Sequence, residues 1–405
     1  MKNLTLTLRK YPSARAFVVF SILFYLAMYV SKTVHALWFD EQHALPLYGF
    51  SYTMMAVAGV LSFLTGRLGD ILSPSFALRT GVILYSIGLF FRIITNSIII
   101  AGLSGFIAGI GASLVIVSMR HWILSIGEEE DRPAVVSLKE TSINAGTSIG
   151  TAIAGISVIG VSFVFSKPLA VVLILSAILC FMSIFFIPKI QKINEKDIKE
   201  KEKINNRPRV SKTLFVGVII FGIIAGLTVS MLVPYLPIIL KDQGVPVSFI
   251  GMYMALISIC GVIFSPMFGG KKIDKNKTKI FFLSELFVGI VTLLFLLSLP
   301  NIVIPLILIF RTLFMSGSII SQELLELDMF PKHAIGMLYG FSQSSFFIGD
   351  AVGGTLGGFL YNLNQDYALL VYALLTVMNA LLFTFFYKYI KQTSILGDQY
   401  VSAAK

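Results

Sequence analysis

The sequence predicts an all-α membrane protein with twelve transmembrane helices in two pseudo-symmetric six-helix bundles. Three observations predict this fold class: apolar runs of membrane-spanning length, one long polar connection near the middle, and a repeat that relates the two halves. Hydrophobic residues make up 56% of the 405 residues and charged residues only 13%. A soluble protein has roughly 25% charged residues.

Each apolar run is long enough to cross about 30 Å of hydrocarbon as a helix. The runs are too long for strands of a membrane barrel, which alternate over about 10 residues. No small-residue cleavage site follows the first run, so we expect it to be a retained helix. Pro234 and Pro237 predict a kink at the outer end of the seventh span. In chain order, the expected spans are 14–37, 47–66, 77–97, 99–122, 134–162, 168–188, 213–236, 246–268, 279–299, 302–325, 335–361 and 366–390.

The polar, Lys- and Glu-rich stretch Pro188–Lys212 separates the sixth span from the seventh. Lys and Arg gather in this stretch and in the other loops on its side of the membrane, whereas only Lys167 and Lys241 fall in loops on the opposite side. Because basic loops stay inside, we expect both termini to be cytoplasmic. The net charge of +11 therefore reflects topology, and we expect no nucleic-acid partner. The predicted parts are an N-terminal bundle at 1–189, a cytoplasmic linker at 190–212 and a C-terminal bundle at 213–405.

Two features recur in both halves. "GTSIGTAIAG", from Gly146, aligns with "GDAVGGTLGG", from Gly349, and nearly the same displacement brings "GRLGD" onto "GKKID". Such duplication is typical of secondary transporters, whose binding site lies near the membrane midplane between the repeats. Glycines four residues apart let helix backbones approach closely. We expect a sliding contact between the halves, with static packing as the alternative, at Gly146, Gly150, Gly155, Gly349, Gly353, Gly357 and Gly358.

These stretches resemble the major facilitator superfamily across the whole chain. The loop after the second span, "GRLGDILSPSFALR", is similar to that family's motif, and "GKKIDKNKTK" is its second-half copy. The resemblance implies a cytoplasmic gate, with an ordinary capped turn as the alternative. The implied gating residues are Gly66, Asp70, Arg79, Gly270, Asp274 and Lys275. The glycine stretch resembles the family's antiporter motif, with Thr151 in place of its proline, and this implies export.

Two ionisable residues deep within spans are candidates for function, because a charge at this depth costs about 2.5–3.5 kcal/mol. Asp350 lies near the middle of the eleventh span, where we expect proton coupling or cation binding, or a structural ion pair with Arg311. Arg311, in the tenth span, could hold an anionic group. Arg92, near the end of the third span, is expected to extend to the membrane interface.

In the family that the sequence resembles, the first, fourth, seventh and tenth helices line a central cavity. We therefore expect the substrate-binding residues on three of these helices, although Lys32 and His35 lie near the outer end and could instead reach the interface. The candidates are Tyr25, Tyr29, Lys32, His35, Thr228, Tyr235 and Arg311. This mixed chemistry favours an anionic or zwitterionic substrate over a lipophilic cation.

The sequence thus predicts a proton-coupled secondary active transporter that exports a small organic compound, a drug or a secreted metabolite, by alternating access. An uptake transporter and a non-transporting sensor are the alternatives. No phosphate loop, zincin motif or nucleophile elbow is present, so we expect no enzyme. Cys180 and Cys260 match no disulfide or metal pattern, and we expect neither metal nor cofactor. The expected partners are the substrate, protons and membrane lipid, for a monomer in a bacterial plasma membrane.

Overall fold

The computed structural model describes residues 2–71, 73–126, 129–188, 210–297, 299–331 and 334–403. Within these ranges all regular structure is helical, and the twelve predicted spans are each found as helix. Nine helical stretches of the described chain are long and apolar enough to cross a membrane. The others are the second span, which is broken in its middle, the shorter eighth span and the glycine-rich eleventh span.

The N-terminal bundle contains the first six spans. Many of its helices begin with a proline in the first turn, where the missing N–H would have no helical partner. Ser73 caps one of these helices, α5, and Ser97 caps α6; each side chain accepts the backbone N–H of the third following residue. The elements are α1 (Lys2–Lys10), α2 (Pro12–Glu41), α3 (Leu45–Val60), α4 (Ser62–Ile71), α5 (Pro74–Phe91), α6 (Ile98–Ser125), η1 (Glu129–Asp131), α7 (Arg132–Ser162), α8 (Pro168–Met182) and η2 (Ser183–Phe186).

The C-terminal bundle contains the other six spans. The seventh span breaks as predicted, because Pro234 and Pro237 lack the N–H that would continue the helix, and α10 passes through η3 into α11. The elements are α10 (Lys212–Leu232), η3 (Val233–Tyr235), α11 (Leu236–Asp242), α12 (Val247–Phe264), η4 (Ser265–Phe268), α13 (Lys271–Lys275), α14 (Lys277–Leu293), η5 (Leu294–Leu296), α15 (Ile304–Met329), α16 (Ile335–Leu363) and α17 (Gln365–Ala403).

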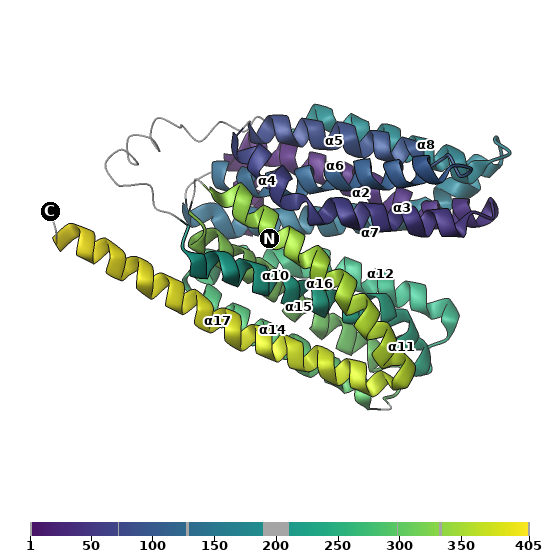
Figure 1. The fold of residues 1–405 in the computed structure, drawn as a ribbon. Coiled ribbons are helices and arrows are strands. Elements are labelled where there is room, and N and C mark those ends of the chain that lie inside the picture. The colour runs from purple at the N-terminus through teal and green to yellow at the C-terminus, as the bar shows by residue number, and fades with distance from the viewer. Residues whose placement is uncertain are drawn as a thin grey trace.

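The two bundles lie side by side and draw apart away from the end that carries α4 (Figure 1). We call the end that carries α1, η1 and α13 the linker end, and the other the opposite end. At the linker end one buried apolar cluster contains residues of both bundles, such as Trp122 and Tyr339. At the opposite end each bundle has a cluster of its own, around Trp38 and around Phe295. The apolar core therefore joins the bundles at the linker end.

The glycines of the repeat pack within each bundle, so the predicted sliding contact between the halves is wrong. Gly146 and Gly150 of α7 face the backbone carbonyls of Ile22 and Leu26 in α2. The same arrangement recurs in the other bundle, where α16 packs on α10. There Gly349 and Gly353 face the carbonyls of Ile223 and Leu227, and Gly357 and Gly358 lie against Tyr235, whereas Gly155 has open space.

Replacing Gly349 by alanine should therefore destabilise the C-terminal bundle by about 1–3 kcal/mol, because the new methyl group would overlap the carbonyl of Ile223. Gly354, on the same helix, has no atom within 4 Å of a Cβ. Gly354→Ala is thus the matched control, and it should be neutral or slightly stabilising, since alanine favours helix. Thermal unfolding of the two purified variants in detergent measures the difference. Equal midpoints would contradict the packing argument.

Candidate functional site

The bundles meet at the linker end through two contacts that the repeat relates. Ser137 of α7 donates its hydroxyl to the carbonyl oxygen of Ser265 in η4, at 2.5 Å. In the equivalent contact, a Cβ on Gly340 of α16 would lie 2.6 Å from the carbonyl oxygen of Ser62 in α4. The break between α3 and α4 also frees the N–H of Phe63, which donates to Ser344 at 3.0 Å. Backbone groups therefore form much of the contact between the bundles at the linker end, which we call the closure.

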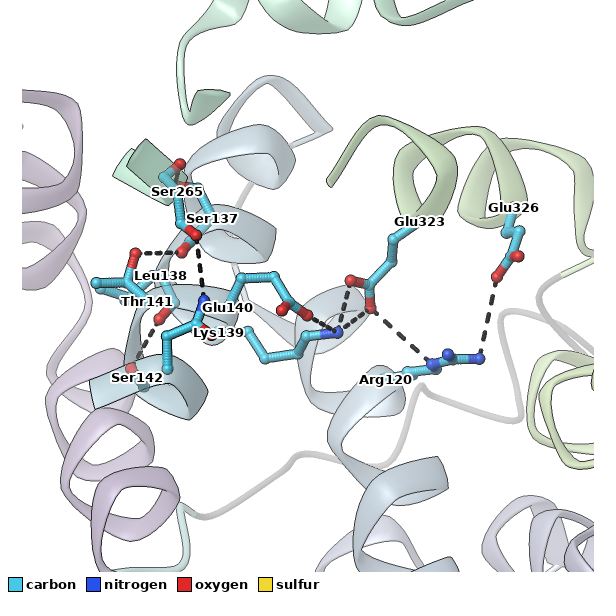
Figure 2. Close-up of polar contacts among 11 residues, drawn as sticks. Arg120, Ser137, Leu138, Lys139, Glu140, Thr141, Ser142, Ser265, Glu323 and Glu326 are labelled. Carbon is cyan, nitrogen blue, oxygen red and sulfur yellow. Dashed lines mark hydrogen bonds and ion pairs between the residues drawn. The ribbon is translucent and has the colours of Figure 1, made fainter. Parts of the chain in front are cut away.

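A buried network of charges crosses between the bundles beside these contacts (Figure 2). Lys139 of α7 donates to Glu323 of α15, with Nζ 2.6 Å from Oε1, and it also lies 3.1 Å from Glu140. Arg120 of α6 is 4.0 Å from both Glu323 and Glu326. Its guanidinium stacks 3.9 Å from the ring centre of Tyr339 in α16. Breaking one such buried pair is costly, because the remaining charge has no partner.

Exposed charges add to the linker end. Lys271 of α13 pairs with Glu130 across the bundles, and its hydrogen bond lowers the pKa of the Glu130 carboxyl. Hydrogen bonds from Lys10 and Tyr11 hold the pKa of Asp131 below its usual range. Both carboxyls therefore stay ionised near neutral pH.

A cavity of about 290 Å³ extends from this network toward the centre of the molecule, and we call it the Arg311 cavity. Arg311 is buried in its wall, with Nε 3.2 Å from Thr292 and Nη2 3.0 Å from the hydroxyl of Tyr372. Glu285, in the same wall, accepts hydrogen bonds from Ser318 and Asn379. The cavity also reaches Arg120, Lys139, Glu140, Glu323 and Glu326.

A second cavity, of about 180 Å³, lies nearer the opposite end, and we call it the Arg92 cavity. Arg92 lines it and is only 5% exposed, so the expectation that it reaches the membrane interface is wrong. His35 lines the same cavity, is buried, and has its ring edge-on to Phe39 and Tyr48. Both bundles contribute to the wall, because Phe347 and Asp350 of α16 complete it.

Asp350 and Arg311 lie in different cavities, and no ion pair joins them in the described part of the chain. The alternative of a structural pair between them is therefore wrong. Asp350 is half-buried in the Arg92 cavity, which Lys32 also lines.

The predicted substrate-binding residues divide among three surroundings. Lys32 and His35 line the Arg92 cavity, and Thr228 and Arg311 line the Arg311 cavity. Tyr25 is buried beside Gly146, and Tyr29 lies under Lys32, with the ammonium 5.5 Å from the ring centre; neither lines these two cavities. Tyr235 donates its hydroxyl to the carbonyl of Gly354 and stacks on Tyr361, which is a packing position.

The predicted gating residues are less closely grouped than the resemblance implies. Gly66 packs against the carbonyl of Gly336 in the other bundle. Asp274 accepts from Lys277 of its own bundle, at 2.9 Å. Arg79 and Lys275 are exposed, and Gly270 lines a surface hollow beside α1. The side chain of Asp70 lies outside the described residues.

The interbundle charge network was not predicted from the sequence. Its members stand at the ends of spans, where charges are ordinarily solvated. One signal could have found it: Glu323 lies at the same displacement from Arg120 as Gly349 from Gly146. Opposite charges at repeat-related positions face each other when two halves meet about a pseudo-twofold axis. Among the described residues, no three His, Cys, Asp or Glu side chains are grouped as metal ligands.

Comparison with known proteins agrees with this architecture. The model of the Major Facilitator Superfamily matches residues 14–326 and 218–395. No curated protein sequence gives a significant match. Among solved structures, a human organic anion transporter superposes with a TM-score of 0.74 at 12% identity, covering 92% of this chain and 98% of that one.

Two further structures have the same fold. The E. coli fucose:proton symporter gives a TM-score of 0.70 at 17% identity, covering 93% of this chain and 98% of the symporter. A bacterial homologue of the iron transporter ferroportin, in its outward-facing state, gives 0.69 at 14% identity, covering 94% and 99%. The family match spans nearly all of the described helices, from α2 to α17. The chain therefore belongs to the major facilitator superfamily and is a multi-pass membrane transporter, not an enzyme.

Proposed function

We propose that this transporter is a proton-coupled secondary active exporter of a small anionic or zwitterionic organic compound, working by alternating access in a bacterial plasma membrane. One observation carries the proposal: two cavities lined by charged side chains lie between bundles whose shared apolar core is at the linker end. Charges within a membrane mark substrate and ion pathways. Proton coupling is also in keeping with the similar fold of the E. coli fucose:proton symporter.

In this proposal the linker end is cytoplasmic, so the conformation faces outward. The moving units are the bundles at 1–189 and 213–405, joined by the linker at 190–212, in a monomer. Asp350 carries the coupled proton. The Arg311 cavity, with Thr228, and the Arg92 cavity, with Lys32 and His35, receive the substrate. Closure of the linker end depends on Gly66 and on the network of Lys139 and Glu323.

Uptake is a second candidate, favoured by the position of Asp350. Asp350 shares its cavity with Lys32 and Arg92, and a negative carboxylate there opposes an anionic substrate. Taking up a proton would remove that opposition, so proton and anion would bind together. Such positive linkage is the requirement for co-transport in one direction.

Substrate-driven proton flux in proteoliposomes tests the proposal, with a panel of drugs, amino-acid-like metabolites and organic acids. A compound should drive flux with the wild type, and Asp350→Asn should lose the flux while still binding the compound. Asp366→Asn, at an exposed aspartate of α17, is the matched control and should behave as wild type. Normal coupling in Asp350→Asn would remove Asp350 from the mechanism. Binding without flux for every compound would favour the sensor.

A further inference from the structure

Arg92 is a buried cation with no counter-ion among the described residues. Its Nη1 donates to the hydroxyl of Ser31 at 2.9 Å, and its Nη2 lies 3.7 Å from the sulfur of Met55. Within the described chain, its Nε has no hydrogen-bond partner and no carboxylate lies within ion-pair distance of the guanidinium. Arginine keeps its charge in proteins, and a buried charge left unpaired is strongly destabilising.

His35, which lines the same cavity, contains a second unsatisfied group. The residue is 4% exposed, and its Nε2 has no hydrogen-bond partner among the described residues. The ring is fixed between Phe39 and Tyr48, with ring centres at 4.8 and 4.9 Å. Two buried nitrogens, Nε of Arg92 and Nε2 of His35, thus have no hydrogen-bond partner among the described residues, and both residues line the same cavity.

Asp350 does not supply the missing charge. It is the one carboxylate among the residues described in the wall of this cavity, and Lys32 is the cation whose charge acts on it. It also belongs to the other bundle, so its distance from Arg92 changes whenever the bundles move. With His35 neutral, Arg92 and Lys32 leave the cavity one positive charge in excess over Asp350. One monovalent anion would therefore bring the net charge of the cavity to zero.

We propose that the Arg92 cavity binds the carboxylate of a small organic acid with an aromatic or apolar body. Arg92 holds the carboxylate, for which its planar fork of donors is suited, and His35 donates a hydrogen bond to it. Tyr48, Tyr52 and Phe347 of the wall pack against the body. This inference rests on the proposed function and names the substrate class of that transporter.

Equilibrium binding of radiolabelled benzoate to the purified full-length protein in lipid nanodiscs tests the proposal. Benzamide has nearly the same shape without the charge, and it should compete at least tenfold more weakly than unlabelled benzoate. Arg92→Gln should weaken benzoate binding at least tenfold. Lys241→Gln, which removes an exposed cation at the same end of the molecule, should leave the affinity unchanged.

Two further variants keep the test decisive if Arg92→Gln does not fold. Arg92→Lys retains the charge but not the fork, and it should bind benzoate several-fold more weakly than wild type. Asp350→Asn removes the opposing carboxylate and should bind benzoate several-fold more tightly. If Arg92 had a purely structural role, benzoate affinity would not fall in Arg92→Lys and rise in Asp350→Asn.

Equal affinities for benzoate and benzamide would overturn the proposal, as would benzoate binding that Arg92→Gln and Arg92→Lys leave intact, or a folded wild type that does not bind benzoate. Flux measurements separate this inference from the proposed function. If benzoate binds through Arg92 but no compound drives flux, the anion site stands and the proposed function fails. If compounds drive proton flux that is equal in wild type and Arg92→Gln, the function stands and the anion site fails.

Discussion

Lys139→Gln is expected to open the linker end. The substitution removes the nearer of the two cations at buried Glu323, whose Nζ lies 2.6 Å from the carboxylate in the closed conformation, and leaves only Arg120 at 4.0 Å. Removing one partner of a buried pair costs about 3–5 kcal/mol. In the proposed alternating-access cycle the bundles separate and water reaches Glu323, so this cost falls on the closed conformation. The ratio of closed to open molecules should then drop by more than about a hundredfold.

Spin labels at Arg9 and Lys272, exposed residues of the two bundles at this end, would report the opening. Pulsed electron paramagnetic resonance should give a longer distance between the two labels. Cys180 and Cys260 are both free and are replaced by alanine in the labelled background. The double variant Lys139→Gln with Glu323→Gln should recover most of the closure, because two neutral amides can hydrogen-bond. Lys271→Gln, which removes an exposed pair, should change little, since water screens that pair. A single variant as closed as wild type would contradict the assignment.

Gly66→Ala should shift the protein toward the same open conformation by a different physical route. A methyl group on Gly66 of α4 would overlap the carbonyl oxygen of Gly336 in α16, and neither backbone can yield locally. These two helices belong to different bundles, so separating the bundles relieves the overlap. We therefore expect a longer distance between the labels, with a thermal midpoint close to that of wild type.

Gly349→Ala makes the comparison informative, because its overlap lies inside one bundle and no rigid-body movement relieves it. Gly155→Ala, in open space, should alter neither the distance nor the midpoint. If Gly66→Ala lowered the midpoint and left the label distance as in wild type, the contact would be part of a static core and not of a gate.

The twelve spans and the division into halves were predictable because both depend on composition over long windows. The length of the apolar runs predicts the helices, and the constant spacing of the sequence repeat relates Gly146 to Gly349. The kink at Pro234 was predictable for a different reason, because it depends only on the residues at that position. By contrast, Arg92 was misassigned. Its depth in the span was predicted correctly, but the direction of its side chain was not, because the sequence does not say which side of a helix packs against a neighbour.

The site was harder to predict than the fold, because it depends on which helices meet. Nothing near Lys139 in the sequence indicates that Glu323 is its partner. The glycines of α7 and α16 were identified as close contacts, but the helix they contact is α2 or α10 of the same bundle. Orphaned atoms, such as Nε of Arg92, are defined only by three-dimensional surroundings.

The closure at the linker end uses peptide groups and missing side chains, as in the approach of Gly340 to the carbonyl of Ser62 and the N–H of Phe63 bonded to Ser344. The Arg92 cavity, by contrast, is built from side chains of α2, α3, α5 and α6 and from Arg92, which follows α5, with Phe347 and Asp350 of α16. A point mutation in that wall can alter which compound is accepted without touching the closure. The residues of the Arg92 cavity are thus distinct from those whose backbones meet at the linker end, so selectivity in this cavity can change while those backbone contacts are kept.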